Sequence, residues 1–155
     1  MDIVKLVKKI VKKYNTNNPF DICRKMNIIV IETSLGKMTR GFYQYLKRNH
    51  VIYLDSDLKY EEKKMVLAHE LGHALMHKKI NAIFLDTRTF LKTSYYEKDA
   101  DTFATMLLIS DDDLLEYINC EYTIENIANI YGCSKELIEL RFKYLDINKF
   151  KHIYS

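Results

Sequence analysis

The feature that most restricts the fold of this chain is a helical pattern over residues 59–77 that is apolar on nearly every side. Between Met65 and Met76, the one charged residue is Glu70. A helix on the surface of a protein keeps a polar face toward solvent, whereas a helix that is apolar all round is buried. We therefore expect this helix to lie in the centre of the fold. The residues just before it, 55–57, are acidic or hydroxyl-bearing and are predicted to cap its first turn.

The residues before this helix predict two short helices followed by strands. Apolar residues recur at helical spacing up to Asn15, and Asn18 then predicts the start of a second helix that ends near Met26. Runs of β-branched and aromatic residues follow, separated near residues 47–49 by a turn-like sequence. These runs predict a small antiparallel sheet, with strands at residues 28–33, 41–46 and 50–54.

The residues after the central helix predict a loop and then only helices. Residues 78–93 show no clear period, and a loop of this length in a compact domain is functional or mobile. Ser94 is predicted to cap a helix that ends near Ile109. Three short helices are expected at residues 111–119, 124–131 and 135–145, with N-caps at Ser110, Thr123 and Ser134 and a C-terminal stop at Gly132.

Together these elements predict an α+β fold in one domain, because 155 residues suffice for one hydrophobic core and hardly for two. Its expected parts are N-terminal helices (1–27), a core (28–109) and C-terminal helices (110–147). The three cysteines form no C-x-x-C pair, and no secretory signal or stretch of transmembrane length is present, so we expect a cytoplasmic protein without a membrane partner. A net charge of +3 does not by itself imply nucleic acid.

His69, Glu70 and His73 form an H-E-x-x-H pattern within the central helix. Residues four apart on a helix share one face, so the two imidazoles can converge on one metal ion. Glu70 projects about 100° round the helix from His69 and is placed to reach a water on that metal. The alternative is a pair of core histidines that serve only packing. Two imidazoles and a carboxylate in an apolar helix would then need other partners.

A catalytic zinc needs one more protein ligand, for which His77, Glu97 and Asp99 are candidates. Glu97 and Asp101 lie four apart at the edge of the apolar stripe of the next helix. We therefore predict Glu97 as the third ligand and Asp101 as the partner of a ligating histidine's second nitrogen. His77 is predicted to lie behind the ligands, since no glycine breaks the helix to turn it toward the metal. The alternative is that Glu97 and Asp101 are solvated acids.

The strings at residues 66–77 (VLAHELGHALMH) and 97–104 (EKDADTFA) resemble those of the ImmA/IrrE metallopeptidases, and the resemblance extends from about Gly41 to Leu145. It implies a zincin-like fold with a gluzincin-type zinc site, in which the first glutamate of the second string, Glu97, is a ligand. It also implies a phage or mobile-element protein that relieves repression by cleaving or disabling a helix-turn-helix repressor.

These observations predict a zinc endopeptidase in which Glu70 moves the proton from water to the leaving amine. Weak candidates for the group that stabilises the oxyanion are Tyr95, Tyr96 and His152. Either strand 41–46 or strand 50–54 would pair with the substrate backbone if it formed the sheet edge.

The competing hypothesis comes from the last two predicted helices, whose length and turn are typical of a helix-turn-helix. Under that hypothesis the protein is a non-proteolytic antirepressor or a DNA- or transcription-factor-binding regulator, with zinc in a structural role. Mixed charges at Lys135, Glu136 and Glu139 make phosphate contact unfavourable there, so nucleic acid is not the expected partner.

Overall fold

A computed structural model describes residues 1–78 and 90–150 of the chain, with side chains described at 1–78 and 94–148. It has the α+β composition expected from the sequence. The predicted loop at 78–93 lies mostly outside the described residues. The elements are α1 (Ile3–Tyr14), α2 (Pro19–Lys25), β1 (Ile29–Thr33), β2 (Gly41–Leu46), β3 (Asn49–Asp55), α3 (Tyr60–Met76), α5 (Phe90–Leu108), α6 (Asp111–Asn119), α7 (Ile124–Tyr131), α8 (Lys135–Phe142) and a 3-10 turn, η1 (Ile147–Phe150).

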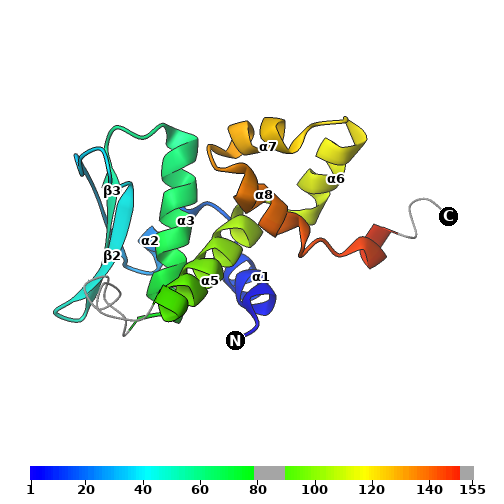
Figure 1. Ribbon diagram of the computed structural model, residues 1–155. Coiled ribbons are helices and arrows are strands. Elements are labelled where there is room, and N and C mark those ends of the chain that lie inside the picture. Colours follow the sequence, from blue (N-terminus) through cyan, green and yellow to red (C-terminus); the bar gives the residue numbers. More distant parts are fainter. Residues whose placement is uncertain (79–89, 151–155) are drawn as a thin grey trace.

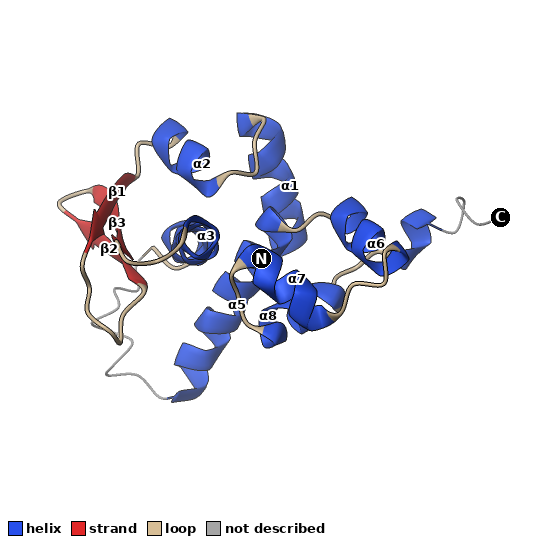
Figure 2. Ribbon diagram, turned by 90° about the horizontal axis from the view of Figure 1, so that it is seen from above, coloured by secondary structure: helices blue, strands red, loops and turns tan. Residues whose placement is uncertain are grey.

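The apolar helix α3 lies in the centre of the fold, as its sequence predicted. It packs against α5, α2 and α7 and against strands β2 and β3. Seen nearly end-on, α3 lies between the sheet on one side and α1, α5 and the C-terminal helices on the other, with α2 beside it (Figure 2). The α6–α8 segment lies on the side of α3 away from the sheet (Figure 1). A site on the first turns of α3 is therefore bordered by the sheet on one side and by the α7–α8 turn on the other.

The sheet is mixed, so the prediction of an antiparallel sheet was wrong for one of its two pairings. Its order is β1-β3-β2, with β1 parallel to β3 and β2 antiparallel to β3. β3 lies between the two earlier strands and runs in the same direction as β1, so the β1–β3 pairing is parallel. Consecutive strands form an antiparallel pair only at the β2–β3 hairpin, where Lys47 and Arg48 adopt φ values of 46° and 67°. Two left-handed residues are typical of a tight hairpin turn.

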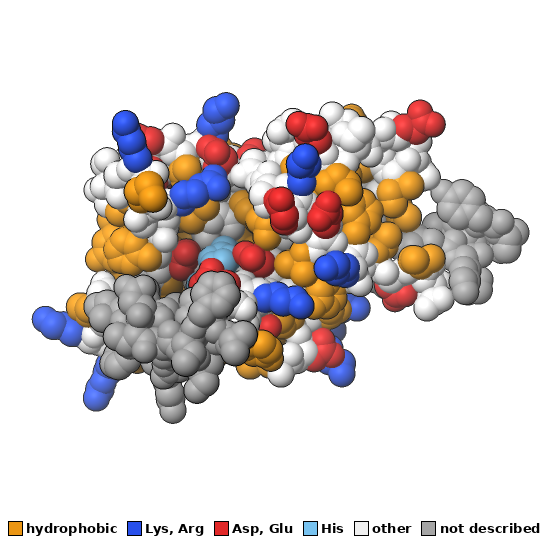
Figure 3. Space-filling model, in the orientation of Figure 1, with side chains coloured by type: hydrophobic (Ala, Val, Ile, Leu, Met, Phe, Trp, Pro, Cys, Tyr) orange, Lys and Arg blue, Asp and Glu red, His pale blue; other side chains and the backbone are white. Residues whose placement is uncertain are grey.

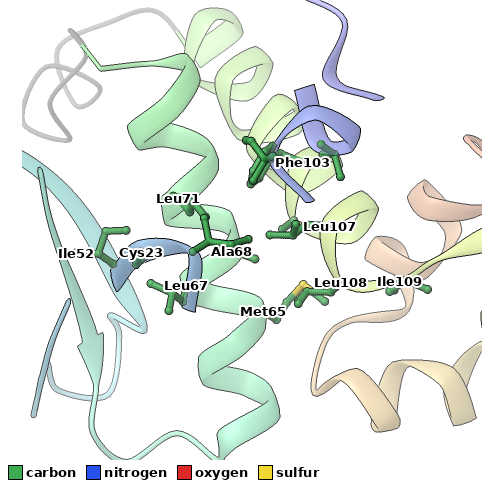
Figure 4. Close-up of a cluster of buried hydrophobic side chains, with 14 of the residues drawn as sticks. Cys23, Ile52, Met65, Leu67, Ala68, Leu71, Phe103, Leu107, Leu108 and Ile109 are labelled. Carbon is green, nitrogen blue, oxygen red and sulfur yellow. The ribbon is translucent and has the colours of Figure 1, made fainter. Parts of the chain in front are cut away.

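The core is formed mainly by apolar side chains of α3 and α5. Leu67, Ala68 and Leu71 are completely buried. Leu67 lies on the side of α3 toward Cys23 and Ile52, whereas Phe103 and Leu107 of α5 lie on the other side (Figure 4). A further part of this cluster lies between α3 and the sheet. There it includes Cys23 of α2 and the strand residues Ile52 and Leu54.

The helix ends confirm most of the predicted caps. The side chains of Ser110 and Thr123 accept hydrogen bonds from backbone amides of their first turns, and Gly132 ends α7 with a left-handed φ of 60°. Ser134 is the N-cap of α8 but makes no side-chain cap bond. Ser94 was predicted wrongly as a cap, since α5 begins earlier, at Phe90.

The predicted acidic cap of α3 was also wrong. Asp55 is the last residue of β3, and its carboxylate accepts from the backbone amides of Leu35 and Asp57 instead. The N-cap of α3 is Lys59, whose backbone N–H donates to the Glu62 carboxylate at 2.9 Å. Within the described parts of the chain, no helix is both long and apolar enough to cross a bilayer.

Candidate metal centre

His69 and His73 lie on the face of α3 that is turned toward α5. Their Nε2 atoms are 3.1 Å apart, and the rings meet edge to face with centroids 4.8 Å apart. Gly72 allows this approach of the two helices: a Cβ at that position would lie 3.2 Å from the Phe103 ring and 3.3 Å from the Ala100 Cα. A larger residue would therefore push α5 away from the histidines.

The close packing of α5 brings Glu97 between the two imidazoles. Its two carboxylate oxygens lie 3.2 Å from His69 Nε2 and 3.2 Å from His73 Nε2. One ligand atom from each of the three residues lies within 4.8 Å of the other two. Zinc bonds of about 2.0 to 2.2 Å in tetrahedral geometry separate neighbouring ligand atoms by about 3.4 Å. The spacing of these three side chains therefore fits a single small metal ion.

The second ring nitrogen of each histidine also has a partner. His69 Nδ1 lies 2.8 Å from the Asp101 carboxylate, and His73 Nδ1 lies 2.9 Å from His77 Nδ1. A partner on the far nitrogen holds the ring in orientation and leaves Nε2 for a metal. His77 is the residue at which α3 ends, and it points to the back of His73 and not toward Glu97.

Asp99, the third candidate ligand, lies apart from the centre. Its carboxylate is 3.7 Å from His77 Nε2. Tyr96 packs on the His77 ring at 4.7 Å between centroids, and Tyr95 packs on Tyr96 and is largely exposed. The remaining oxyanion candidate, His152, lies outside the described residues.

Glu70 is buried beside the two histidines, with 8% of its surface exposed. Burial raises the pKa of its carboxyl, while the charges of His69 and His73 and a hydrogen bond from the Tyr43 backbone oppose that rise. A carboxylate with a raised pKa in this position can hold a proton closer to neutral pH than a solvated glutamate can.

The charges of the centre are strongly coupled. Burial opposes the charged form of His69, but hydrogen bonds to Asp101 and Glu97 outweigh it and raise the His69 pKa to about 10. Hydrogen bonds from His69 and from His73 hold the pKa of the Glu97 carboxyl far below its ordinary value. In the absence of a metal, the cluster therefore keeps a proton among its nitrogens at neutral pH.

A cavity of about 240 Å³ opens beside the cluster. Figure 3 shows histidine reaching the surface there between acidic side chains. Sequence reasoning missed several lining residues, because nothing local in the sequence indicates that the α7–α8 turn lies against α3. The lining consists of Arg40, Gly41, Met65, Val66, His69, Glu70, Asp101, Ala104, Gly132, Cys133, Ser134 and Leu137.

Comparison with known sequences agrees with this geometry. The sequence model of a peptidase family, described as IrrE N-terminal-like domain, matches residues 23–143. The chain belongs to this ImmA/IrrE family. It is 40% identical over 135 residues to "Uncharacterized immunity region protein 2" of Bacillus phage phi105, covering 87% of this chain and 85% of the phage protein. It is 29% identical over 138 residues to "Metallopeptidase ImmA" of Bacillus subtilis (strain 168), covering 88% and 75%.

The fold of this chain is similar to that of a solved structure, a Mycobacterium tuberculosis transcriptional regulator, with a TM-score of 0.62 and 12% identity. The match covers 90% of this chain and 46% of the other, so the chain spans less than half of that protein. At this identity the likeness shows a shared fold alone. Membership of the ImmA/IrrE family confirms the resemblance seen in the sequence. It also supports a metallopeptidase activity for this chain.

Proposed function

We propose that this ImmA/IrrE protein is a zinc-dependent endopeptidase of zincin-like architecture. The observation that carries the proposal is the convergence of His69, His73 and Glu97 on one point, with the buried carboxylate of Glu70 beside it. Two nitrogens and one carboxylate oxygen are a donor set typical of catalytic zinc, and they leave a position for water. A closed structural site would need a fourth protein ligand.

Each side chain has a distinct task in this proposal. His69, His73 and Glu97 hold Zn²⁺, while Asp101 and His77 hold the two imidazoles in orientation. Bound zinc would lower the pKa of a water and polarise the substrate carbonyl. Glu70 accepts the proton of that water and delivers it to the leaving amine, a transfer that its raised pKa favours.

The position of the strands favours β2 as the backbone partner of the substrate. β3 is the central strand and has neighbours on both sides, whereas β2 is at the edge of the sheet. Gly41, the first residue of β2, lines the cavity beside Glu70. An extended peptide that paired with β2 would therefore pass in front of the metal centre.

The proposed substrate is a helix-turn-helix repressor in the cytoplasm, whose cleavage relieves repression. The support is the names of the relatives, one an immunity region protein of a phage and the other the metallopeptidase ImmA. A non-proteolytic antirepressor would use the same partner without consuming it, and loss of Glu70 would then leave its effect intact.

The proposal is tested by incubating the zinc-loaded chain with the repressor encoded beside its gene, with and without a chelator. We expect discrete fragments that disappear with the chelator and return when zinc is restored. An intact repressor in a stable complex with the zinc-loaded chain would contradict the peptidase proposal and favour the antirepressor.

A further inference from the structure

The helix-turn-helix-like pair α7–α8 is fixed against the first turns of α3. Gly132, in the turn between the two helices, adopts a φ of +60°. A Cβ at this position would lie 2.9 Å from the Glu62 backbone nitrogen and 3.2 Å from the Glu61 carbonyl carbon. Such close backbone contact requires glycine, and it places residues that follow Gly132 in the lining of the cavity beside Glu70.

These following residues form one wall of that cavity. Cys133, Ser134 and Leu137 lie on the α7–α8 side, and Arg40 and Gly41 lie on the strand side. Between the two walls the surface is apolar, formed by Met65 and Val66 of α3 and Ala104 of α5.

The acidic and basic side chains that line the cavity belong to ion pairs or to the metal centre. Arg40 is paired with Glu62 at 3.3 Å. His69 and Asp101 are hydrogen-bonded to each other at 2.8 Å, and Glu70 lies beside them. A charged side chain placed in the cavity would lose its hydration without a free partner of opposite charge, which is costly, whereas an apolar side chain gains by leaving water.

We infer that this cavity accepts an apolar side chain of the substrate residue next to the scissile bond, and that Leu137 limits the size of that side chain. The inference rests on the proposed peptidase function, since it names the substrate feature that the same site selects. Leu137 is partly buried in the first turn of α8 and packs against the core cluster. Its side chain is therefore held in place while it borders the cavity.

This role also accounts for the helix-turn-helix-like pair without DNA. A DNA-reading helix presents its N-terminal residues to the base edges. In this chain, Ser134 at the N-cap and Leu137 in the first turn of α8 line the cavity, and Glu136 between them is exposed. The N-terminal end of α8 thus faces a peptide cleft and carries an acid that phosphate would repel.

A binding measurement tests the cavity without relying on turnover. The probes are two succinyl hydroxamates, one bearing an isobutyl group on the carbon beside the amide and one without it. With the zinc-loaded chain, calorimetry should show about 10-fold or tighter binding of the isobutyl compound, the order expected for apolar groups in a fitted pocket. Leu137→Phe should abolish this gain by filling the cavity. Equal affinity of the wild-type chain for both probes would overturn the inference.

A matched variant separates the cavity from general effects on α8. Leu140→Phe makes the same enlargement on the same helix, but Leu140 is not among the lining residues. The affinity gained from the isobutyl group should survive in Leu140→Phe. If Leu137→Phe and Leu140→Phe reduced this gain equally, Leu137 would have no specific role, and the inference would be wrong.

Cleavage specificity distinguishes failure of this inference from failure of the proposed function. A tryptic peptide library of a bacterial lysate is digested with zinc-loaded protein, and the new termini are sequenced. We expect Leu, Met or Phe on one side of the cut, shifting by about 10- to 200-fold toward smaller residues in Leu137→Phe. Metal-dependent cleavage with no such preference would overturn only the inference. If metal-dependent cleavage occurred neither in the library nor in the neighbouring repressor, the peptidase proposal would fail, and the hydroxamate measurement would still show whether the cavity accepts an apolar group.

Discussion

Two polar clusters lie against α5 in this protein, and they are built in opposite ways. At one, His69 and His73 direct nitrogens at each other and at Glu97, with separations of 3.1 and 3.2 Å. At the other, Arg141 of α8 donates to the Ile109 carbonyl at 2.8 Å and to the Asp111 carboxylate at 2.6 Å.

The arginine cluster places Arg141 Nε and Nη2 each opposite an acceptor oxygen and joins α8 to the α5–α6 junction. Its third guanidinium nitrogen, Nη1, is the one buried side-chain nitrogen or oxygen among the described residues that has no hydrogen-bond partner. The histidine cluster instead gathers atoms with electron pairs at one point, an arrangement that is stable only with protons or a metal between them. Both clusters contain buried titratable side chains, so burial alone does not identify a metal centre. The convergence of lone pairs, found at the histidine cluster, does.

The largest expected effect comes from removing the third ligand. Glu97→Ala should abolish stoichiometric zinc, weakening its binding by more than ~100-fold, because two imidazoles on one helix cannot complete a tetrahedral site. Elemental analysis of the purified variant measures this loss. His77→Ala is the comparison variant: His77 lies behind His73, so its loss should weaken zinc binding by no more than about 10- to 100-fold and leave zinc stoichiometric. A zinc-free His77→Ala beside a zinc-replete Glu97→Ala would reverse the two roles.

Removing the arginine should affect stability and leave zinc binding unchanged. Arg141→Met leaves the Asp111 carboxylate and the Ile109 carbonyl without the guanidinium, and breaking a buried pair typically costs about 3 to 5 kcal/mol. Urea unfolding of the zinc-loaded protein should show this loss while zinc remains stoichiometric. Lys143→Met, at an exposed position just after α8, is the control and should change little. Loss of zinc in folded Arg141→Met would mean that the two clusters are not independent.

A smaller effect is expected at Asp101, which holds His69 without touching the metal position. Asp101→Ala should weaken zinc binding by about 10- to 100-fold, as is typical of a partner behind a ligand. Competition with a chelator of known affinity measures this change. Asp99→Ala is a suitable comparison on the same helix, because Asp99 lies 3.7 Å from His77 and not beside His69. Equal losses in both variants would argue for a general effect of charge.

The smallest effect is a pH dependence of the metal-free protein. Because the pKa of His69 is raised from 6.5 to about 10, its contribution to stability is complete below pH 6.5 and is lost as pH rises toward 10. The lowered pKa of Glu97 makes its contribution present above its ordinary value of 4.5 and lost in acid. Melting temperatures in chelator should therefore fall between pH 6.5 and 10, and Asp101→Ala should flatten this slope. A melting temperature that rises over this range would contradict the charge coupling.

Local features of this fold were predictable from the sequence, because their causes lie within a few residues. The burial of α3 follows from its apolar surface, and the meeting of His69 and His73 follows from helical spacing. The choice of Glu97 and Asp101 over Asp99 also rested on helical spacing, and the structure brings the first two to the histidines.

The features that sequence reasoning missed depend on contacts between distant segments. The parallel β1–β3 pairing arises because β3 lies between two earlier strands, which no local pattern specifies. The packing of the Gly132 turn on Glu62 places Leu137 in the cavity, although 75 residues of sequence separate Leu137 from Glu62. The burial of Arg141 likewise requires the end of α5, where its carbonyl partner lies.

The central claim is that the histidine cluster holds a metal for catalysis with Glu70 as its proton carrier. The most direct measurement compares wild-type protein with Glu70→Gln for zinc content and for cleavage of the neighbouring repressor. The account predicts one zinc per chain in both and a cleavage rate lower by at least ~100-fold in the variant, because only the proton transfer is lost. Full activity in Glu70→Gln, or zinc lost in step with activity, would contradict it.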